Sequence, residues 1–307
     1  MKTRLITGAT YFAILLPLVI INTALTKVLY VVLTMFVCFY CSFELMRAAI
    51  NHNRVNNENT NIEKLKFVIP TLSMILGALA CISTYQFSSL GEKGIIYYLY
   101  TFIFFIIAMF SVLCSLVVIP NTTMKDFGSC MLALAYSGLL MGFAFIIRFF
   151  EPSGLNEIVN INGTKSFLFV YTIVVITDSF AMILGCKYGK HRLAPTISPK
   201  KSVEGAISGL VGGMIFGIVG LFVYQIIDFD KSKLAVILMT IIISLVISAS
   251  GQFGDLIESK IKRSFDIKDM GRILPGHGGI LDRFDSLLFA GLMYYVVVMI
   301  IELTMIG

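Results

Sequence analysis

Residues 259–285 read SKIKRSFDIKDMGRILPGHGGILDRFD and form a polar segment in an otherwise apolar chain. The segment holds six cationic side chains, four carboxylates, one histidine and four glycines, whereas 57% of the whole sequence is hydrophobic. Apolar runs of helical length flank it on both sides. Charged side chains are costly in lipid, so a segment anchored by apolar helices at both ends is expected at the water interface. The stretch therefore predicts a membrane bundle with an interfacial polar segment.

The apolar runs around this segment have the length of membrane spans. A mean hydropathy of +0.89 with only 14% charged residues excludes an ordinary soluble domain. The runs lack the alternation of barrel strands, and backbone groups in lipid must be paired, so we read them as helices. They lie near 6–25, 28–49, 67–87, 95–119, 128–150, 166–186, 206–227, 234–253 and 286–306. The sequence predicts an all-α polytopic membrane protein with about nine transmembrane helices.

The cationic residues predict the orientation of these helices. If the N-terminus is cytoplasmic, 18 of the 24 Lys and Arg residues fall on the inner side and six on the outer side. We therefore expect a multi-pass protein of the cell membrane with its polar segment facing the cytoplasm. A cleaved signal peptide over residues 1–27 is the alternative for the first run, but no small-x-small cleavage site is evident. The net charge of +6 suits lipid head groups and nucleotide phosphates and requires no nucleic-acid partner.

The chain divides by the chemistry of its loops. Residues 1–165 form five predicted spans with no recognisable chemistry, and residues 166–307 form four spans with charged, glycine-rich loops. Gly209, Gly213 and Gly217 recur at a spacing that lets helices approach closely, either within the protein or across a dimer. The Cys38-x-x-Cys41 pair lies mid-span without a nearby histidine, so we expect packing residues there rather than a redox or metal pair.

Candidate binding residues occur in the sixth apolar run and in the cytoplasmic loop that follows it. Asp178 lies inside an apolar run, where a carboxylate is costly unless it faces a polar cavity, a metal or a cation; a hydrogen-bonded structural role is the alternative. Ser198 precedes Pro199 and is expected to open a helix with Glu204 in its first turn. Lys200 and Lys201 flank that start and are candidates for phosphate binding, although a positive-inside anchor has the same composition.

Carboxylates recur on both sides of the polar segment. Asp255 lies before it, and Asp282 and Asp285 lie at its end, spaced by three residues. Mg²⁺ prefers one or two carboxylates together with phosphate oxygens, so these acids are candidate ligands; a helix-dipole partner is the alternative for one such pair. Gly276, Gly278 and Gly279 can expose backbone N–H groups to phosphate, and His277 can donate a hydrogen bond.

The polar segment resembles the signature of the phosphatidate cytidylyltransferase family, also called CDP-diacylglycerol synthase. The matching positions are Ser259, Ile261, Lys262, Arg263, Lys268, Asp269, Gly271, Leu274, Pro275, His277, Gly278, Gly279, Ile280, Asp282, Arg283, Phe284 and Asp285. A second similar stretch comprises Asp178, Gly185, Gly189, Lys190, Pro195, Ser198 to Ser202, Glu204 and Gly205. The two stretches lie in about the last 130 residues, and the first five spans are similar in hydropathy only.

The resemblance implies a reaction of phospholipid biosynthesis, CTP + phosphatidate → CDP-diacylglycerol + pyrophosphate. It also implies a homodimer, a polar cavity open to the cytoplasm and to lipid, and dependence on Mg²⁺, with a second, monovalent cation left open. Asp255 and Asp282 are the implied metal ligands, with Asp285 and Asp178 as second choices. The implied phosphate-binding cations are Lys200, Lys201, Lys262, Arg263, Lys268 and Arg283.

Three alternatives remain at this point. A sister enzyme would transfer a cytidylyl group to another lipid phosphate or alcohol. A transporter would use Asp178 as an ion site, but it should show two related halves and charges near mid-bilayer. An inactive scaffold would keep the fold, and the intact charged positions of the signature argue against it.

Overall fold

The computed structural model describes residues 13–56, 60–151, 162–224, 226, 233–273 and 278–306. Within these ranges, eight helices are long and apolar enough to cross a membrane. They correspond to the eight predicted runs from 28–49 onward. The run predicted near 6–25 is described from residue 13 onward, and residues 13–20 of it are helical. The spans are Ala24–Val55, Ile62–Leu90, Ile95–Val118, Met124–Phe149, Gly163–Tyr188, Val203–Val223, Leu234–Ser264 and Leu281–Ile301. The mostly helical membrane class is confirmed.

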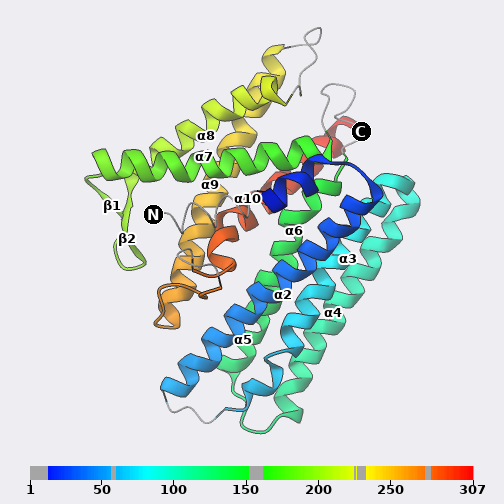
Figure 1. Ribbon diagram of the computed structural model, residues 1–307, viewed down its shortest axis with the longest axis vertical. Helices are drawn as coiled ribbons and strands as arrows, with labels where there is room; N and C mark the ends of the chain where they lie inside the picture. Colours follow the sequence, from blue (N-terminus) through cyan, green and yellow to red (C-terminus); the bar gives the residue numbers. More distant parts are fainter. Residues whose placement is uncertain are drawn as a thin grey trace. The chain divides into compact units, whose positions relative to one another are not determined.

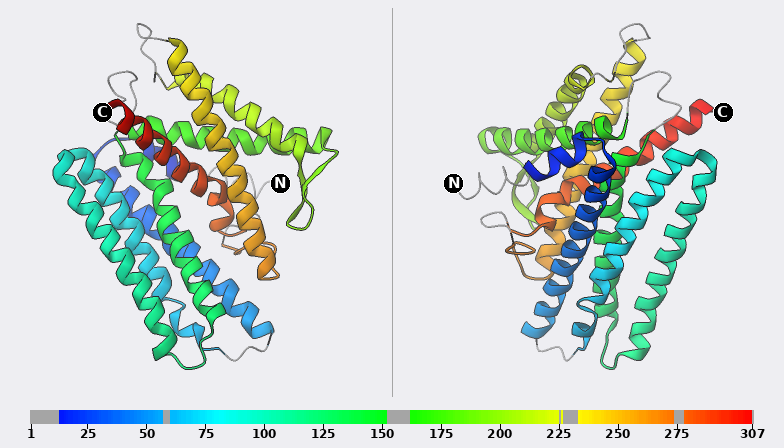
Figure 2. Two further views of the ribbon diagram at one scale, coloured as in Figure 1. Left: turned by 180° about the vertical axis from the view of Figure 1, so that it is seen from behind. Right: turned by 45° about the vertical axis from the view of Figure 1, so that its right-hand side comes forward.

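Figures 1 and 2 show these helices with the labels used below. The α-helices are α2 (Ala24–Val55), α3 (Val68–Leu90), α4 (Ile95–Val118), α5 (Met124–Leu134), α6 (Met141–Ile146), α7 (Gly163–Tyr188), α8 (Val203–Val223), α9 (Lys233–Ser264) and α10 (Leu281–Ile306). The connecting elements are η1 (Ile62–Leu65), η2 (Gly91–Gly94), η3 (Ala135–Leu140), η4 (Ile147–Phe149) and the strands β1 (Arg192–Ala194) and β2 (Ser198–Ser202).

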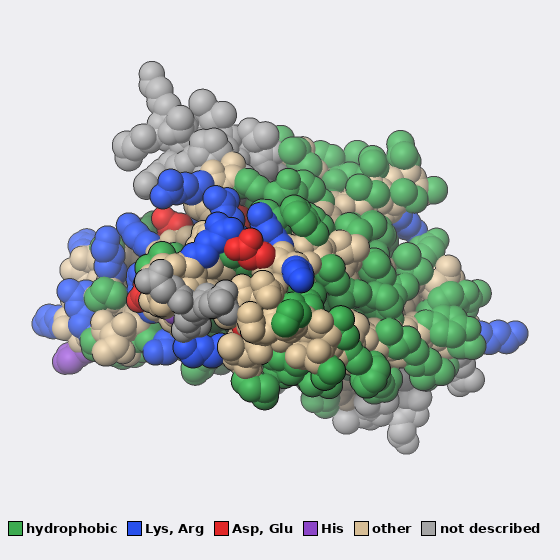
Figure 3. All heavy atoms as spheres, turned by 90° about the horizontal axis from the view of Figure 1, so that it is seen from below, with side chains coloured by type: hydrophobic (Ala, Val, Ile, Leu, Met, Phe, Trp, Pro, Cys, Tyr) green, Lys and Arg blue, Asp and Glu red, His purple; other side chains and the backbone are tan. Residues whose placement is uncertain are grey.

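The surface of the helices is suited to lipid. Leu99, Phe102 and Phe110 of α4 are each more than half exposed. Figure 3 shows broad areas of hydrophobic side chains on one face of the molecule. Such exposure would be costly in water, whereas lipid tails solvate apolar side chains without that cost.

The chain forms two compact units, and their boundaries fall inside α9 and α10. The first unit comprises Met1–Ile146 and Lys262–Phe284. In it α2 packs on α3 and α5, and α3 also packs on α4 (Figures 1 and 2). The Tyr30 hydroxyl donates to the Phe145 carbonyl over 3.1 Å, so a buried polar group is satisfied within this core. The polar segment 262–284 thus belongs to a unit built mainly from N-terminal sequence.

The second unit comprises Ile147–Ile261 and Asp285–Gly307. In it α7 packs closely along α8 (Figure 1). A Cβ added at Gly213 would meet the hydroxyls of Thr177 and Ser248, from α7 and α9. The α8 glycines therefore serve packing inside the unit, which is the internal alternative of the two that their spacing allowed.

The start of α8 differs from the sequence prediction, and α9 extends past its apolar run. Ser198 was expected to open a helix, and this is wrong: Ser198–Ser202 is β2, which pairs antiparallel with β1. The helix α8 begins at Val203 because Ser202 is its N-cap and accepts the Gly205 N–H over 3.1 Å. The helix α9 continues past the apolar run 234–253 to Ser264, because polar residues can extend a helix beyond its apolar part.

Candidate functional site

Asp282 organises the polar segment within the first unit. Its Oδ1 accepts a hydrogen bond from Lys262 Nζ over 2.9 Å. Its Oδ2 accepts the backbone N–H groups of Met270 over 3.0 Å and Gly279 over 2.7 Å. The Asp282 side chain is only 4% exposed. A buried carboxylate needs such partners, so Asp282 ties the end of α9 to the loop and to the start of α10.

Glu44 of α2 is a second buried carboxylate in this unit and was not among the site residues predicted from the sequence. Its two oxygens accept the N–H groups of Ile280 and Leu281, each over 3.0 Å. These N–H groups lie at the start of α10, where a helix has unpaired donors and favours negative charge. The available signal was a carboxylate inside an apolar run, the criterion that did select Asp178.

The glycines of the segment fit closely against these two acids. A Cβ on Gly271 or Gly279 would overlap the Glu44 carboxylate. Gly278 has φ +84°, and a Cβ there would lie 2.8 Å from Asp282 Oδ2. The loop can therefore wrap two carboxylates only because these positions lack side chains.

The predicted phosphate-binding cations of the first unit differ in exposure. Lys262 is half-buried against Asp282, whereas Arg263, Lys268 and Arg283 are exposed. Arg263 also donates to the Ile267 carbonyl over 3.0 Å. The predicted residues Gly276 and His277 lie outside the described part of the chain. The structure therefore joins Lys262, Asp282, Gly278 and Gly279 at one place.

In the second unit, Asp255 pairs with a lysine of the hairpin. Asp255 Oδ2 forms a salt bridge with Lys201 Nζ, and the two side chains are 29% and 27% exposed. Asp178 lies near enough to interact electrostatically with both residues, and it accepts a hydrogen bond from Ser286. Ser259, one turn after Asp255 on α9, donates to Asp255 Oδ1 over 3.5 Å. Residues predicted from three separate stretches of sequence thus meet in this unit.

The remaining predicted residues of the second unit lie in the hairpin and at the starts of α8 and α10. Asp285 Oδ1 accepts the Ser286 N–H over 2.7 Å. Glu204 lies in the first turn of α8, as predicted, and binds His191 Nδ1 over 2.6 Å and the Lys190 N–H over 3.1 Å. It therefore fixes the start of the hairpin. Ser198 and Lys200 lie on β2, where Lys200 is exposed.

The donor set suits a hard divalent cation. Within the described ranges, no group of three or more His, Cys, Asp or Glu residues gathers as a metal cage. Mg²⁺ does not require such a cage, because one or two carboxylates with water and phosphate oxygens suffice. Asp178 and Asp255 are neighbouring carboxylates of the second unit, and hard oxygen ligands of this kind fit Mg²⁺. Asp282 belongs to the first unit, so its pairing with Asp255 stays a prediction.

These features define a helical membrane protein with buried acids and cations in its polar loops. The chain belongs to the cytidylyltransferase family, whose match covers residues 2–301. It is 41% identical over 186 residues to phosphatidate cytidylyltransferases of Staphylococcus haemolyticus and Staphylococcus saprophyticus. The aligned part covers 60% of this chain and 64% of each relative. A Staphylococcus aureus phosphatidate cytidylyltransferase is 40% identical over the same length.

Proposed function

We propose that this protein is a phosphatidate cytidylyltransferase that makes CDP-diacylglycerol and pyrophosphate from CTP and phosphatidate. The family match across residues 2–301 carries the proposal. The names of its relatives supply the substrates. The concentration of cations and carboxylates in residues 259–285 and in the hairpin is consistent with two phosphate-bearing substrates.

The reaction needs positioning and neutralisation of charge more than proton transfer. An oxygen of the lipid phosphate forms a bond to the α-phosphorus of CTP, and the bond from that phosphorus to the β-phosphate oxygen breaks. The attacking phosphate is already ionised at neutral pH, so no strong general base is required. The lysines and arginines of the polar loops bind the phosphates, orient the two substrates and stabilise the leaving pyrophosphate.

Mg²⁺ is the proposed cofactor. Asp255 is the ligand indicated both by the family signature and by its place in the second unit. The signature implies Asp282 as its partner, and Asp178 is its neighbour in the second unit. When bound, the ion would screen the repulsion between the two anionic substrates. Lys201, already paired with Asp255, would then be free to contact a substrate phosphate.

The proposed setting is the cell membrane, with the polar segment and the hairpin on the cytoplasmic side, where CTP is found. The excess of cations in those loops supports this orientation. A homodimer and a polar cavity open to the cytoplasm and to lipid belong to the same proposal. They rest on the family resemblance.

The test is an assay of purified protein in detergent with labelled CTP, phosphatidate and Mg²⁺. Lipid-soluble CDP-diacylglycerol should form with release of one pyrophosphate per product. Asp255→Asn should abolish it, whereas the matched variant Glu63→Gln, at an exposed acid paired with Arg54, should remain active. Absence of lipid-soluble product with every divalent cation tried would refute the proposal.

A further inference from the structure

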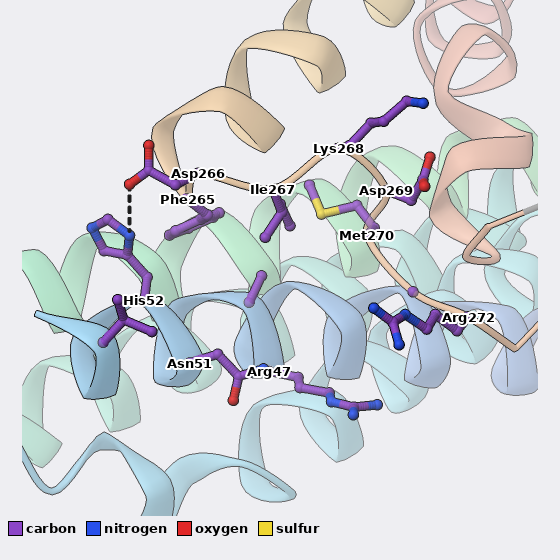
Figure 4. A pocket seen from close by; sticks show the side chains of 13 residues that line it. Arg47, Asn51, His52, Phe265, Asp266, Ile267, Lys268, Asp269, Met270 and Arg272 are labelled. Carbon is purple, nitrogen blue, oxygen red and sulfur yellow. Dashed lines mark ion pairs between the residues drawn. The ribbon is translucent and has the colours of Figure 1, made fainter.

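A cavity in the first unit borders the Asp282 and Glu44 contacts, since Met270 and Gly271 belong to its lining. Its volume is about 590 Å³, within the usual range for a small-molecule site. The helix α2 supplies one wall, which includes Arg47, Asn51 and His52, and residues 265–272 supply the other. Figure 4 shows these side chains from close by. The cavity therefore joins N-terminal sequence to the signature segment.

The charges in this cavity are unequally matched. Arg47, Lys268 and Arg272 provide three cations, and Asp266 and Asp269 provide two carboxylates. Asp266 faces His52, with 3.5 Å between Oδ2 and Nδ1. Figure 4 shows Arg47 and Arg272 toward the opposite end of the cavity from this pair. The lining as a whole therefore has more cationic than anionic side chains.

Neither arginine is neutralised by a salt bridge to an acid in the described part of the chain. Glu44, one turn before Arg47 on α2, attracts Arg47 electrostatically, but its two oxygens accept the N–H groups of Ile280 and Leu281. Two guanidinium groups in one cavity repel each other, and an anion between them removes that repulsion. A guanidinium group can also donate two parallel hydrogen bonds to phosphate oxygens, a bidentate geometry that lysine cannot form.

The two arginines are held on a common support. Gly271, next to Arg272, packs against the Glu44 carboxylate, and Glu44 lies three residues before Arg47 on α2. The segments that carry the two arginines therefore touch each other through Gly271 and Glu44 without any ligand. A site whose charged groups are already placed loses less conformational freedom on binding.

We infer that this cavity binds an anionic ligand, whose phosphate groups are bound by Arg47 and Arg272. Lys268 and the Asn51 amide add donors along the same walls. A nucleoside triphosphate and a lipid phosphate share this chemistry. That the ligand is a substrate of the enzyme rests on the proposed function, whereas phosphate binding itself does not. Neither arginine was among the candidate site residues of the sequence.

The experiment measures binding without turnover. Purified protein in phosphatidylcholine nanodiscs is titrated with labelled CTP and with inorganic pyrophosphate, and phosphatidate retention is followed separately by native mass spectrometry. Arg47→Gln and Arg272→Gln should each weaken phosphate binding about tenfold, as expected for one lost charge-assisted interaction. The affinity of Arg47→Lys for phosphate should lie between those of the wild type and Arg47→Gln. Lysine keeps the positive charge but lacks the planar guanidinium that can bind two phosphate oxygens at once.

The matched control is Arg54→Gln, which removes the same charge from α2 at a residue that pairs with Glu63 over 2.7 Å. Weaker binding of CTP and pyrophosphate alone assigns the cavity to the nucleotide, and loss of phosphatidate alone assigns it to the lipid. Unchanged binding in all three cavity variants, or an equal loss in Arg54→Gln, overturns the inference. Because no product is measured, binding through Arg47 could be established even if the protein made no CDP-diacylglycerol.

Discussion

A single buried glutamate connects the first and last parts of the first unit. Glu44 is 4% exposed, and its carboxylate accepts hydrogen bonds from two N–H groups at the start of α10 that would otherwise need water. Burying a carboxylate is unfavourable unless each oxygen is hydrogen-bonded, and here both are. The net contribution of these hydrogen bonds to the free energy of unfolding is modest. Removing the carboxylate would nevertheless be strongly destabilising, because it would leave two buried N–H groups without an acceptor.

Glu44→Gln should lower both the activity and the thermal midpoint of the protein. The glutamine amide has one acceptor oxygen and places an NH₂ group against a backbone donor, so about 1–3 kcal/mol of local stability is lost. Activity in the assay above and thermal unfolding in detergent measure the two effects. Glu63→Gln makes the same chemical change at an exposed acid and should leave both unchanged. Equal behaviour of the two variants would contradict the role assigned to Glu44.

Gly279→Ala should inactivate the protein by displacing the same carboxylate. The added Cβ would lie 2.6 Å from Glu44 oxygens, closer than real contacts allow, so the loop must shift. A double variant with Glu44→Ala should lose less activity than the sum of the two single effects, because the clash partner is absent. Gly128→Ala is the control, since a Cβ there meets nothing within 4 Å. Additive losses in the double variant would argue against contact between the two residues.

At the scale of the elements, α8 depends on small residues along the faces that contact α7 and α9. Thr177 of α7 donates to Ser248 of α9 over 2.9 Å, and Gly213 of α8 lies against both hydroxyls. Gln252 of α9 also donates to the Ala206 carbonyl of α8 over 3.1 Å. Close approach lets polar contacts form between helices, where lipid offers no hydrophobic gain for association.

Gly213→Ala should lower the thermal midpoint by several degrees, because its Cβ would overlap the Ser248 and Thr177 hydroxyls. Adding Ser248→Ala should restore part of the loss, since it removes one of the two overlapping oxygens. Thermal unfolding of the single and double variants in the same detergent is the measurement. No recovery in the double variant would place the strain elsewhere in the helix.

The elements show which parts of the structure could be predicted from sequence. Continuous apolar runs identified the spans, because lipid requires paired backbone groups whatever the tertiary packing. The β2 strand was missed, since Pro199 and the polar residues around it do not distinguish a helix start from a hairpin. Asp178, Asp255 and Lys201 were selected one by one, whereas Glu44 and the Arg47–Arg272 cavity depend on tertiary contacts that hydropathy does not encode.

At the scale of the whole molecule, the residues proposed to act in one reaction belong to both units. Lys201, Asp178 and Asp255 meet in the second unit, and Lys262 and Asp282 meet in the first. In each unit a lysine neutralises a predicted metal ligand. Cations that pair with these acids and also suit phosphate oxygens can exchange one anionic partner for another when ligands bind.

Mg²⁺ should stabilise the protein through Asp178 and Asp255. Wild-type protein should show a rise in thermal midpoint with Mg²⁺ that saturates, because an ion bound only by the folded state shifts unfolding by mass action. Asp178→Asn should need at least about tenfold more Mg²⁺ for the same rise, since it removes one charged ligand of the pair. Glu63→Gln, away from both acids, should follow the wild type. An unchanged midpoint at every Mg²⁺ concentration would count against this ligand pair.

The proposed orientation can be tested with a natural cysteine. Cys186 is exposed near the end of α7, just before the hairpin, whereas Cys38, Cys41, Cys81 and Cys130 are buried. A membrane-impermeant maleimide should label Cys186 in inside-out vesicles and not in right-side-out vesicles, because the neighbouring cations are expected on the cytoplasmic side. Cys186→Ser should abolish that labelling. Labelling confined to right-side-out vesicles would place Lys201 and Asp255 on the side without CTP, and both the orientation and the proposed reaction would then fail.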